Sequence, residues 1–536
     1  MNSISANGSQ SDESAQVPEK SSKVVADFET AISLTGFGQY NYILIALGCL
    51  WNILCLVEVI SFSFIVPILE CHLDLNLSQR GLLTSIIFFG MVCGSVVWGV
   101  LSDLFGRQKV LVLSISMLGI VNIALGFSNT YTLMITFKFF SGFFVCAPLA
   151  IVLSYLGEMH SVAYRLKVLV GISVFYNAGN LVTSLLGLIF LTRKLEVHFL
   201  STTLQSWQLL LLTVALLDII GGALVCIVPE SPKFLMSRGR SEEALQILKT
   251  MYKRNTGKHP DTYPIKILCD EATDSQEQVK PRNSDGCDDA QLEVNVNKCD
   301  FLSRSFKRAF SQIIPMFKPP HVSKCMLVFS IEFFLLLGVN TLRLWMPQVF
   351  SFMANDGNEF DICNEIQPDD MTNATTLESH ECTSFVQPES IFVNSMIVQS
   401  VGIIGAILIC IFINVIHTKL MLVGATLIAS LASLTIYFSI SPIMVVVMYS
   451  LGVGLSSAAH AAFGSILPSI GPTAFRSTVI SISLTCGRIG SMLGTYLFPY
   501  LMAQTCWLPF VAVAVDLLFS SVLCIFLPRT TKKRLL

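Results

Sequence analysis

Long, uninterrupted apolar segments constrain the fold of this chain more than any other feature. Each is at least about as long as the 20 residues that a helix needs to cross a hydrocarbon layer of about 30 Å. Backbone polar groups must be satisfied within each segment in lipid, so the segments predict helices. The predicted spans are 42–69, 81–101, 110–128, 131–156, 168–191, 207–228, 323–350, 390–413, 418–438, 442–467, 475–502 and 506–527.

The composition supports a membrane protein and argues against several other classes. Hydrophobic residues make up 53% of the chain and charged residues only 13%, which is too apolar for a soluble protein of this length. A net charge of −2 without a basic stripe gives no reason to expect a nucleic-acid partner. We find no phosphate-binding loop, nucleophile motif or metal-ligand spacing, so the sequence predicts neither an enzyme nor a cofactor or metal site.

A polar segment divides the twelve spans into two sets of six. Basic residues concentrate in the short loops on the side of both tails, and the positive-inside rule therefore places both termini in the cytoplasm. The predicted parts are a tail (1–40), an N-terminal six-helix bundle (41–228), a partly disordered cytoplasmic linker (229–322), a C-terminal six-helix bundle (323–528) and a second tail (529–536).

The loop 351–389 is then predicted to lie outside the cell or in a vesicle lumen. It contains the glycosylation acceptor Asn373-Ala374-Thr375 and two cysteines, Cys363 and Cys382. Disulfides persist in that compartment, so we predict a bridge between these cysteines, with two free thiols as the alternative.

The most specific motif is Gly99-Val100-Leu101-Ser102-Asp103-Leu104-Phe105-Gly106-Arg107-Gln108-Lys109. Gly99 and Gly106 are predicted to allow a close backbone approach and a tight turn. Asp103 is predicted to cap a helix or to accept from a basic partner across the interface between the halves. The segment resembles the G-x-L-(A/S)-D-x-x-G-R-x-K signature of the major facilitator superfamily. The alternative is a capped basic turn without a gating role.

This resemblance implies an all-α membrane fold of twelve helices in two six-helix bundles. The bundles would rock about a midplane site, and the motif would latch their cytoplasmic side. Further gating residues implied in this way are Glu158 and Arg165, which have the E-x6-R spacing, Glu230 in Pro229-Glu230-Ser231-Pro232-Lys233-Phe234-Leu235, and Arg476.

Within the superfamily, the chain resembles the synaptic vesicle glycoprotein 2 family and the organic-ion transporters. The motifs that show this resemblance are the Pro229–Leu235 segment and Leu344-Trp345-Met346-Pro347. The resemblance implies a plasma membrane or a synaptic or secretory vesicle membrane. It also implies that Trp345 and Tyr176 line the central cavity, where they would clamp an apolar or cationic solute. Packed or lipid-facing aromatic rings are the alternative.

Ionisable residues inside the spans are candidate functional groups, because they are costly at membrane depth. Glu58 and Lys138 are interpreted as an ion pair or as ligands for solute and protons, with a purely structural pair as the alternative. A cavity-facing Arg488 favours an anionic or zwitterionic solute, unless Glu332 neutralises it. Arg343 is predicted to snorkel to the interface.

Two functions remain open from the sequence. The first is a secondary transporter of a small organic solute, either an organic ion or a sugar-like molecule, with protons as the candidate coupling ion. The second is a transporter-like vesicle protein that acts as a receptor or trafficking regulator without transport. Loss of the aspartate and glycines from the C-terminal counterpart of the gate, Asn414-Val415-Ile416-His417-Thr418-Lys419, favours this second function.

Overall fold

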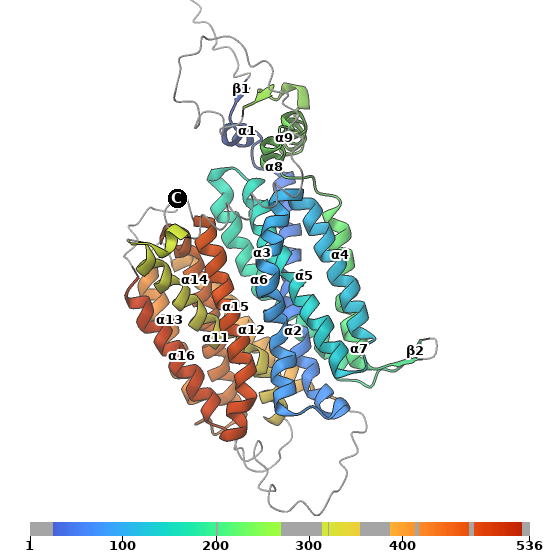
Figure 1. The fold of residues 1–536 in the computed structure, drawn as a ribbon, viewed down its shortest axis with the longest axis vertical. Coiled ribbons are helices and arrows are strands. Elements are labelled where there is room, and N and C mark those ends of the chain that lie inside the picture. Colours follow the sequence, from blue (N-terminus) through green and yellow to red (C-terminus); the bar gives the residue numbers. More distant parts are fainter. Residues whose placement is uncertain are drawn as a thin grey trace, which may run out of the picture.

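Two bundles of long helices lie side by side in the computed structural model (Figure 1). The structure describes residues 25–199, 202–269, 314–319, 321–353, 386–412, 417–470 and 476–527. The N-terminal bundle contains α2 (Gln39–Leu73), α3 (Leu77–Phe105), α4 (Arg107–Gly126), α5 (Tyr131–Glu158), α6 (Val162–Leu191) and α7 (Ser206–Val225). The C-terminal bundle contains α11 (Val322–Met353), α12 (Glu389–Phe412), α13 (Thr418–Thr435), α14 (Pro442–Ile470), α15 (Arg476–Gln504) and α16 (Leu508–Ile525).

The lengths of these helices fit a bilayer. Ten of the helices in the described part of the chain are long and apolar enough to cross a membrane. The other two, α6 and α15, have 30 and 29 residues, so they also have the length for a crossing. Both lie at the boundary of the bundles, where α6 packs against α12 and α15 packs against α3.

Glycine allows the closest helix contacts. A Cβ atom on Gly142 of α5 would collide with the carbonyl oxygen of Ile87 in α3, and one on Gly90 would collide with Phe139 O. In the other bundle, a Cβ on Gly490 of α15 would collide with Phe333 O of α11. Close backbone approach at small residues drives helix association in membranes, where lipid removes the hydrophobic driving force.

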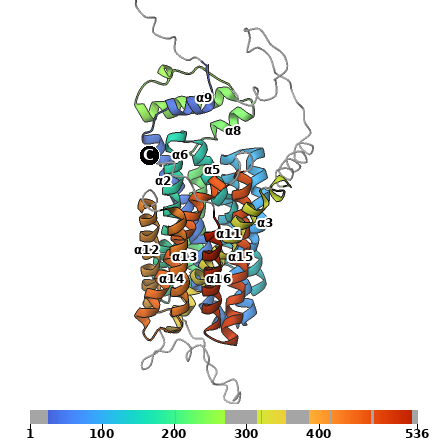
Figure 2. The same ribbon diagram turned by 90° about the vertical axis from the view of Figure 1, so that its left-hand side faces the viewer.

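A small domain of short elements covers one end of the N-terminal bundle, which we call the linker end (Figures 1 and 2). The parallel pair β1–β4 joins the N-terminal segment to the linker. Asn255 of α9 accepts from Tyr40 N at 3.0 Å and donates to Asn41 Oδ1 at 2.7 Å, which ties the linker to the start of α2. The elements are β1 (Val25–Ala26), α1 (Phe28–Leu34), α8 (Pro232–Ser237), α9 (Ser241–Thr256), η1 (Pro260–Thr262) and β4 (Ile267–Leu268). The short helix η2 (Ile314–Phe317) contacts α11 instead.

Contacts between the bundles gather at the other end, which we call the outer end. There Gln387 Nε2 donates to Phe64 O at 2.9 Å, and Gln348 Nε2 donates to Glu70 Oε2 at 3.2 Å. The rings of Phe64 and Phe392 stack with centroids 5.4 Å apart. The bundles are therefore joined at the outer end. A hairpin at the same end contains β2 (Val197–Phe199) and β3 (Thr202–Leu204).

His160, between α5 and α6 at the linker end, makes stability depend on pH. Its Nδ1 donates to Leu156 O at 2.8 Å, whereas its buried Nε2 has no partner. Burial, together with the nearby Arg165 guanidinium, lowers the pKa of His160 below its ordinary value of 6.5. The unfolded chain therefore binds more protons below that pH, so the stability that neutral His160 contributes above pH 6.5 is lost as the pH falls.

We expect the apparent Tm of the purified protein to fall by a few degrees more in the wild type than in His160→Gln when the pH is lowered from about 7.5 to about 5. Thermal unfolding in detergent measures this difference. Parallel pH profiles for the two proteins would contradict the assignment of the effect to His160.

Candidate functional site

A buried ion pair occupies the middle of the N-terminal bundle. Lys138 Nζ on α5 lies 2.6 Å from Glu58 Oε1 on α2 and donates to Glu58 O at 3.1 Å. Both side chains are 1% exposed. Ser141 Oγ, less than one helical turn beyond Lys138, donates to the same carboxylate oxygen. The lysine also lies over the Phe62 ring, 5.1 Å from its centroid.

Two further helices extend this cluster. Asn122 Nδ2 of α4 donates to Glu58 Oε2 at 2.7 Å and to Asp218 Oδ2 of α7 at 2.8 Å. We call Glu58, Lys138, Ser141, Asn122 and Asp218 the Glu58 network. Its two carboxyl groups and one ammonium group leave one surplus negative charge, which is costly in a buried site. One proton shared between the two carboxyl groups would remove that surplus.

The sequence identified only part of the Glu58 network. The structure places Glu58 and Lys138 in contact, which the ion-pair interpretation expected. It also shows that Asp218 of α7 belongs to the same cluster. Asn122 was missed. It could have been found as an asparagine inside an apolar span, because an amide at that depth needs a polar partner.

The predicted gate at the linker end is a compact polar cluster. Arg107 Nη2 lies 3.1 Å from Glu158 Oε1 and 3.2 Å from Asp103 Oδ1. Glu230 Oε1 accepts from the backbone N atoms of Arg107 at 2.8 Å and Gln108 at 3.2 Å, so its carboxylate caps the start of α4. Gly106 has a φ of 100° and contacts Glu230, so a side chain there would be strained.

Other gate predictions fare differently. The prediction that Gly99 allows a close backbone approach is wrong, because a Cβ atom built there would have no neighbouring atom within 4 Å. Asp103 forms its ion pair with Arg107 of its own bundle, and not with a basic residue across the interface between the halves. Arg165 Nη2 lies 2.8 Å from Glu29 Oε1 of α1. Within the described part of the chain, Lys109 forms no ion pair.

Several predicted residues stay untested. Arg476 begins α15, but its side chain is not described. The predicted glycosylation and disulfide residues Asn373, Cys363 and Cys382 lie outside the described residues.

Two arginines lie within spanning helices of the C-terminal bundle. Arg343 of α11 is only 5% exposed, so the prediction that it snorkels to the interface is wrong. Its Nη2 donates to Ser457 Oγ of α14 at 2.6 Å, and its Nη1 donates to Asn340 Oδ1 at 3.3 Å. Arg488 of α15 is partly exposed, and its Nη1 lies 3.1 Å from Cys146 Sγ of α5, across the bundle boundary.

Glu332 does not neutralise Arg488 in this structure. Its Oε1 lies 3.0 Å from His460 Nε2 of α14. The His460 side chain is 34% exposed in the middle of a spanning helix, whereas Glu332 is 1% exposed. Sequence reasoning missed His460, although a histidine inside an apolar span was a visible signal.

The two predicted aromatic residues differ in their surroundings. Trp345 is 2% exposed, stacks on Phe498 with centroids 5.3 Å apart, and donates from Nε1 to Thr495 O at 3.0 Å. It is thus packed inside the C-terminal bundle and does not line an open cavity in this conformation. Tyr176 of α6 is partly exposed and lies within electrostatic range of Arg343 and Arg488.

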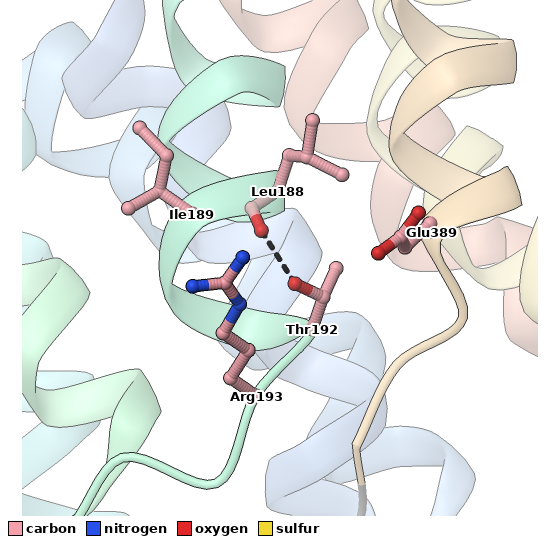
Figure 3. A pocket seen from close by; sticks show the side chains of 5 residues that line it. All are labelled: Leu188, Ile189, Thr192, Arg193 and Glu389. Carbon is pink, nitrogen blue, oxygen red and sulfur yellow. Dashed lines mark hydrogen bonds between the residues drawn. The ribbon is translucent and has the colours of Figure 1, made fainter.

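A hollow of about 250 Å³ lies at the outer end between the bundles (Figure 3). Leu188, Ile189, Thr192 and Arg193 line it from α6 and the residues that follow, and Glu389 lines it from the start of α12. Thr192 Oγ1 donates to Leu188 O at 2.6 Å and is held against its own helix. A much smaller void of about 10 Å³ adjoins Asp218 and Cys55, so the Glu58 network is closely packed.

Comparisons with known proteins agree with these features. Residues 30–283 match the family described as "Sugar (and other) transporter". Synaptic vesicle glycoprotein 2B of Mus musculus is 24% identical over 360 residues, which cover 65% of this chain and 51% of that protein. Synaptic vesicle glycoprotein 2C of Mus musculus is 23% identical, with coverage of 62% and 46%. The chain spans about half the length of these relatives.

Solved structures show the same fold. The inward-open xylose transporter XylE from E. coli aligns with a TM-score of 0.65 at 15% identity, covering 92% of this chain and 98% of that one. Its partially occluded inward-open form has a TM-score of 0.64 at 14% identity, with coverage of 91% and 100%.

The fold is that of the major facilitator superfamily, with six long helices in each of two bundles, as predicted. Within that class, the chain is similar to the synaptic vesicle glycoproteins 2, which confirms the resemblance seen in its motifs. It is a multi-pass membrane protein with this fold.

Proposed function

We propose that this protein is a secondary transporter that moves a small organic solute by alternating access and couples the movement to protons. The Glu58 network carries the proposal. It holds one more carboxyl group than cationic groups within a sealed bundle, so binding and release of one proton would change its charge.

The arrangement of the bundles supports alternating access. Polar and aromatic contacts join them at the outer end, while half-exposed polar groups such as His460 and Arg488 lie at the midplane. Rocking about that level would open the outer end and close the linker end.

The basic residues of the loops support a cytoplasmic linker end, and we place the protein in the plasma membrane or in a synaptic or secretory vesicle membrane. The similarity to the xylose transporter XylE supports sugar-like solutes, whereas the buried Arg343 and the partly exposed Arg488 support an organic ion.

Accumulation of labelled solutes in sealed vesicles tests this proposal. Purified protein is reconstituted, and a panel of sugars and organic ions is screened with and without a pH gradient. We expect accumulation to follow the gradient in the wild type and to lose its pH dependence in Glu58→Gln, because glutamine keeps the shape but cannot exchange a proton. Gradient-driven accumulation that persists unchanged in the variant would contradict the coupling role.

The second candidate function is that of a vesicle receptor or trafficking regulator without transport. The decayed gate segment Asn414–Lys419 and the similarity to synaptic vesicle glycoproteins favour it. Folded wild-type protein that moves no solute of the panel, with or without a gradient, would support this function over the first.

A further inference from the structure

Asp516, near the middle of α16, carries a buried carboxyl group without a partner. The residue is only 8% exposed, and neither Oδ1 nor Oδ2 has a hydrogen-bond partner. The carboxyl group lies against the backbone of α11, because a Cβ atom built on Gly338 would lie 2.8 Å from Asp516 Oδ2. A carboxylate buried in this way is costly, so the group needs a ligand that removes its charge.

Among the described residues, no cation neutralises Asp516. It takes part in none of their ion pairs, and no charged or titratable side chain among them lies within electrostatic range of it. The helices that pack against α16 are α11, α13 and α15. Lys324 lies exposed at the linker end of α11. The other described charged side chains of these helices make contacts elsewhere: Glu332 with His460, Arg343 with Ser457, Lys419 with Leu527 O, and Arg488 with Cys146.

The position of Asp516 repeats that of Asp218 in the N-terminal bundle. Each aspartate lies in the last helix of its bundle. Each also precedes a cysteine–isoleucine pair by eight residues, which is Cys226-Ile227 in one bundle and Cys524-Ile525 in the other. The two bundles of this fold are related by an axis along the membrane normal, so equivalent positions are expected to have equivalent surroundings.

The first helices of the bundles repeat in the same way. Glu58 of α2 and Gly338 of α11 each lie nine residues before the proline inside their helix. Asp218 shares the Asn122 amide with Glu58, and Asp516 lies against Gly338. The Glu58 network has two carboxyl groups and one ammonium group, whereas its counterpart has one carboxyl group alone. Each of these two clusters is therefore left with one surplus negative charge.

We infer that Asp516 binds a proton, so that each bundle holds a proton-binding carboxyl group at the equivalent point between its first and last helices. The proton removes the charge that opposes burial. Its release would place an unpaired carboxylate against the backbone of α11 and would loosen the packing of α11 on α16. The inference goes beyond the proposed function, because the proton at Asp516 does not depend on transport.

Infrared spectroscopy of the purified full-length protein tests the inference directly. A neutral carboxylic acid has a C=O stretching band that is separate from the carboxylate bands, and exposed carboxyl groups are ionised at a pH of about 7.5. We expect Asp516→Asn to remove part of the neutral-acid band at that pH. The matched control is Asp261→Asn in η1, which replaces an exposed carboxyl group and should leave the band unchanged.

Thermal unfolding provides a second readout. The folded protein keeps a proton on Asp516 that the unfolded chain releases at neutral pH, so this contribution to stability is lost as the pH rises. We expect the apparent Tm of the wild type to fall by a few degrees relative to Asp516→Asn between a pH of about 5.5 and about 8.5. Asp261→Asn should follow the wild type. If Asp516→Asn does not fold, Asp516→Thr supplies a neutral side chain of similar volume for both measurements.

Two results would overturn the inference. These are a neutral-acid band that is unchanged in the neutral Asp516 variants, and pH profiles of the Tm that run parallel in these variants and the wild type. The failure of the transport proposal is distinguishable from both, because neither measurement uses a solute. Coupling that persists in Glu58→Gln would contradict the proposed function, and it would leave the band that Asp516→Asn removes unaffected.

Discussion

Replacement of Lys138 by methionine is expected to destabilise the protein by about 3–5 kcal/mol, because it leaves buried carboxyl groups without their cation. Lys138 holds Glu58 at 2.6 Å, and both residues are almost fully buried. We also expect solute accumulation to be lost, because the Glu58 network loses its only cation. Thermal unfolding of the purified variant measures the first effect, and vesicle uptake measures the second.

The double variant Glu58→Gln/Lys138→Met is the control for this prediction. It removes the carboxylate together with the ammonium group, so it should unfold at a higher temperature than Lys138→Met alone. Transport should stay absent in the double variant even where stability returns. If the single and double variants unfold at the same temperature, then charge pairing is not what Lys138 contributes.

Gly142→Ala is the second substitution for which we expect a large effect. A Cβ atom at this position would collide with the carbonyl oxygen of Ile87, so α3 and α5 must move apart. We expect a loss of about 3 kcal/mol, near the upper end of the cost of overpacking. The apparent Tm and the yield of monodisperse protein after detergent extraction measure this loss.

Gly424→Ala in α13 provides a matched control, because no atom lies within 4 Å of a Cβ atom built there. Alanine is favoured over glycine in a helix by about 1 kcal/mol, so this variant should be unchanged or more stable. The two identical substitutions are therefore expected to differ in sign. Similar stabilities for both would show that the close contact of α3 and α5 is not required.

The sequence was sufficient to predict the architecture, because a backbone that crosses lipid has few alternatives to the helix. An apolar segment long enough to span a bilayer must be helical, so twelve such segments predicted the helices of both bundles. The contacts among the predicted gate residues could be expected from local motifs. Gly106, Arg107 and Glu158 belong to short local motifs, and the structure brings Arg107 and Glu158 within 3.1 Å.

The sequence did not identify contacts that depend on how the helices are rotated. Asn122, Asp218 and His460 lie in apolar segments whose buried face has no clear period, because lipid and protein interior are both apolar. Arg343 was misplaced because its distance along the helix from the interface was judged without its neighbours. Ser457 and Asn340 offer it hydrogen bonds in the interior, which outweigh snorkelling.

Distances between the bundles, measured by pulsed spin-label spectroscopy, test alternating access most directly. Label pairs at Leu77 and Ser390 report on the outer end, and pairs at Lys109 and Leu420 report on the linker end, after the exposed Cys93 and Cys226 have been replaced. Rocking predicts two populations, in which the outer pair separates as the linker pair approaches, with the ratio shifted by pH. A single unchanging distance for both pairs under all conditions would contradict a transporter.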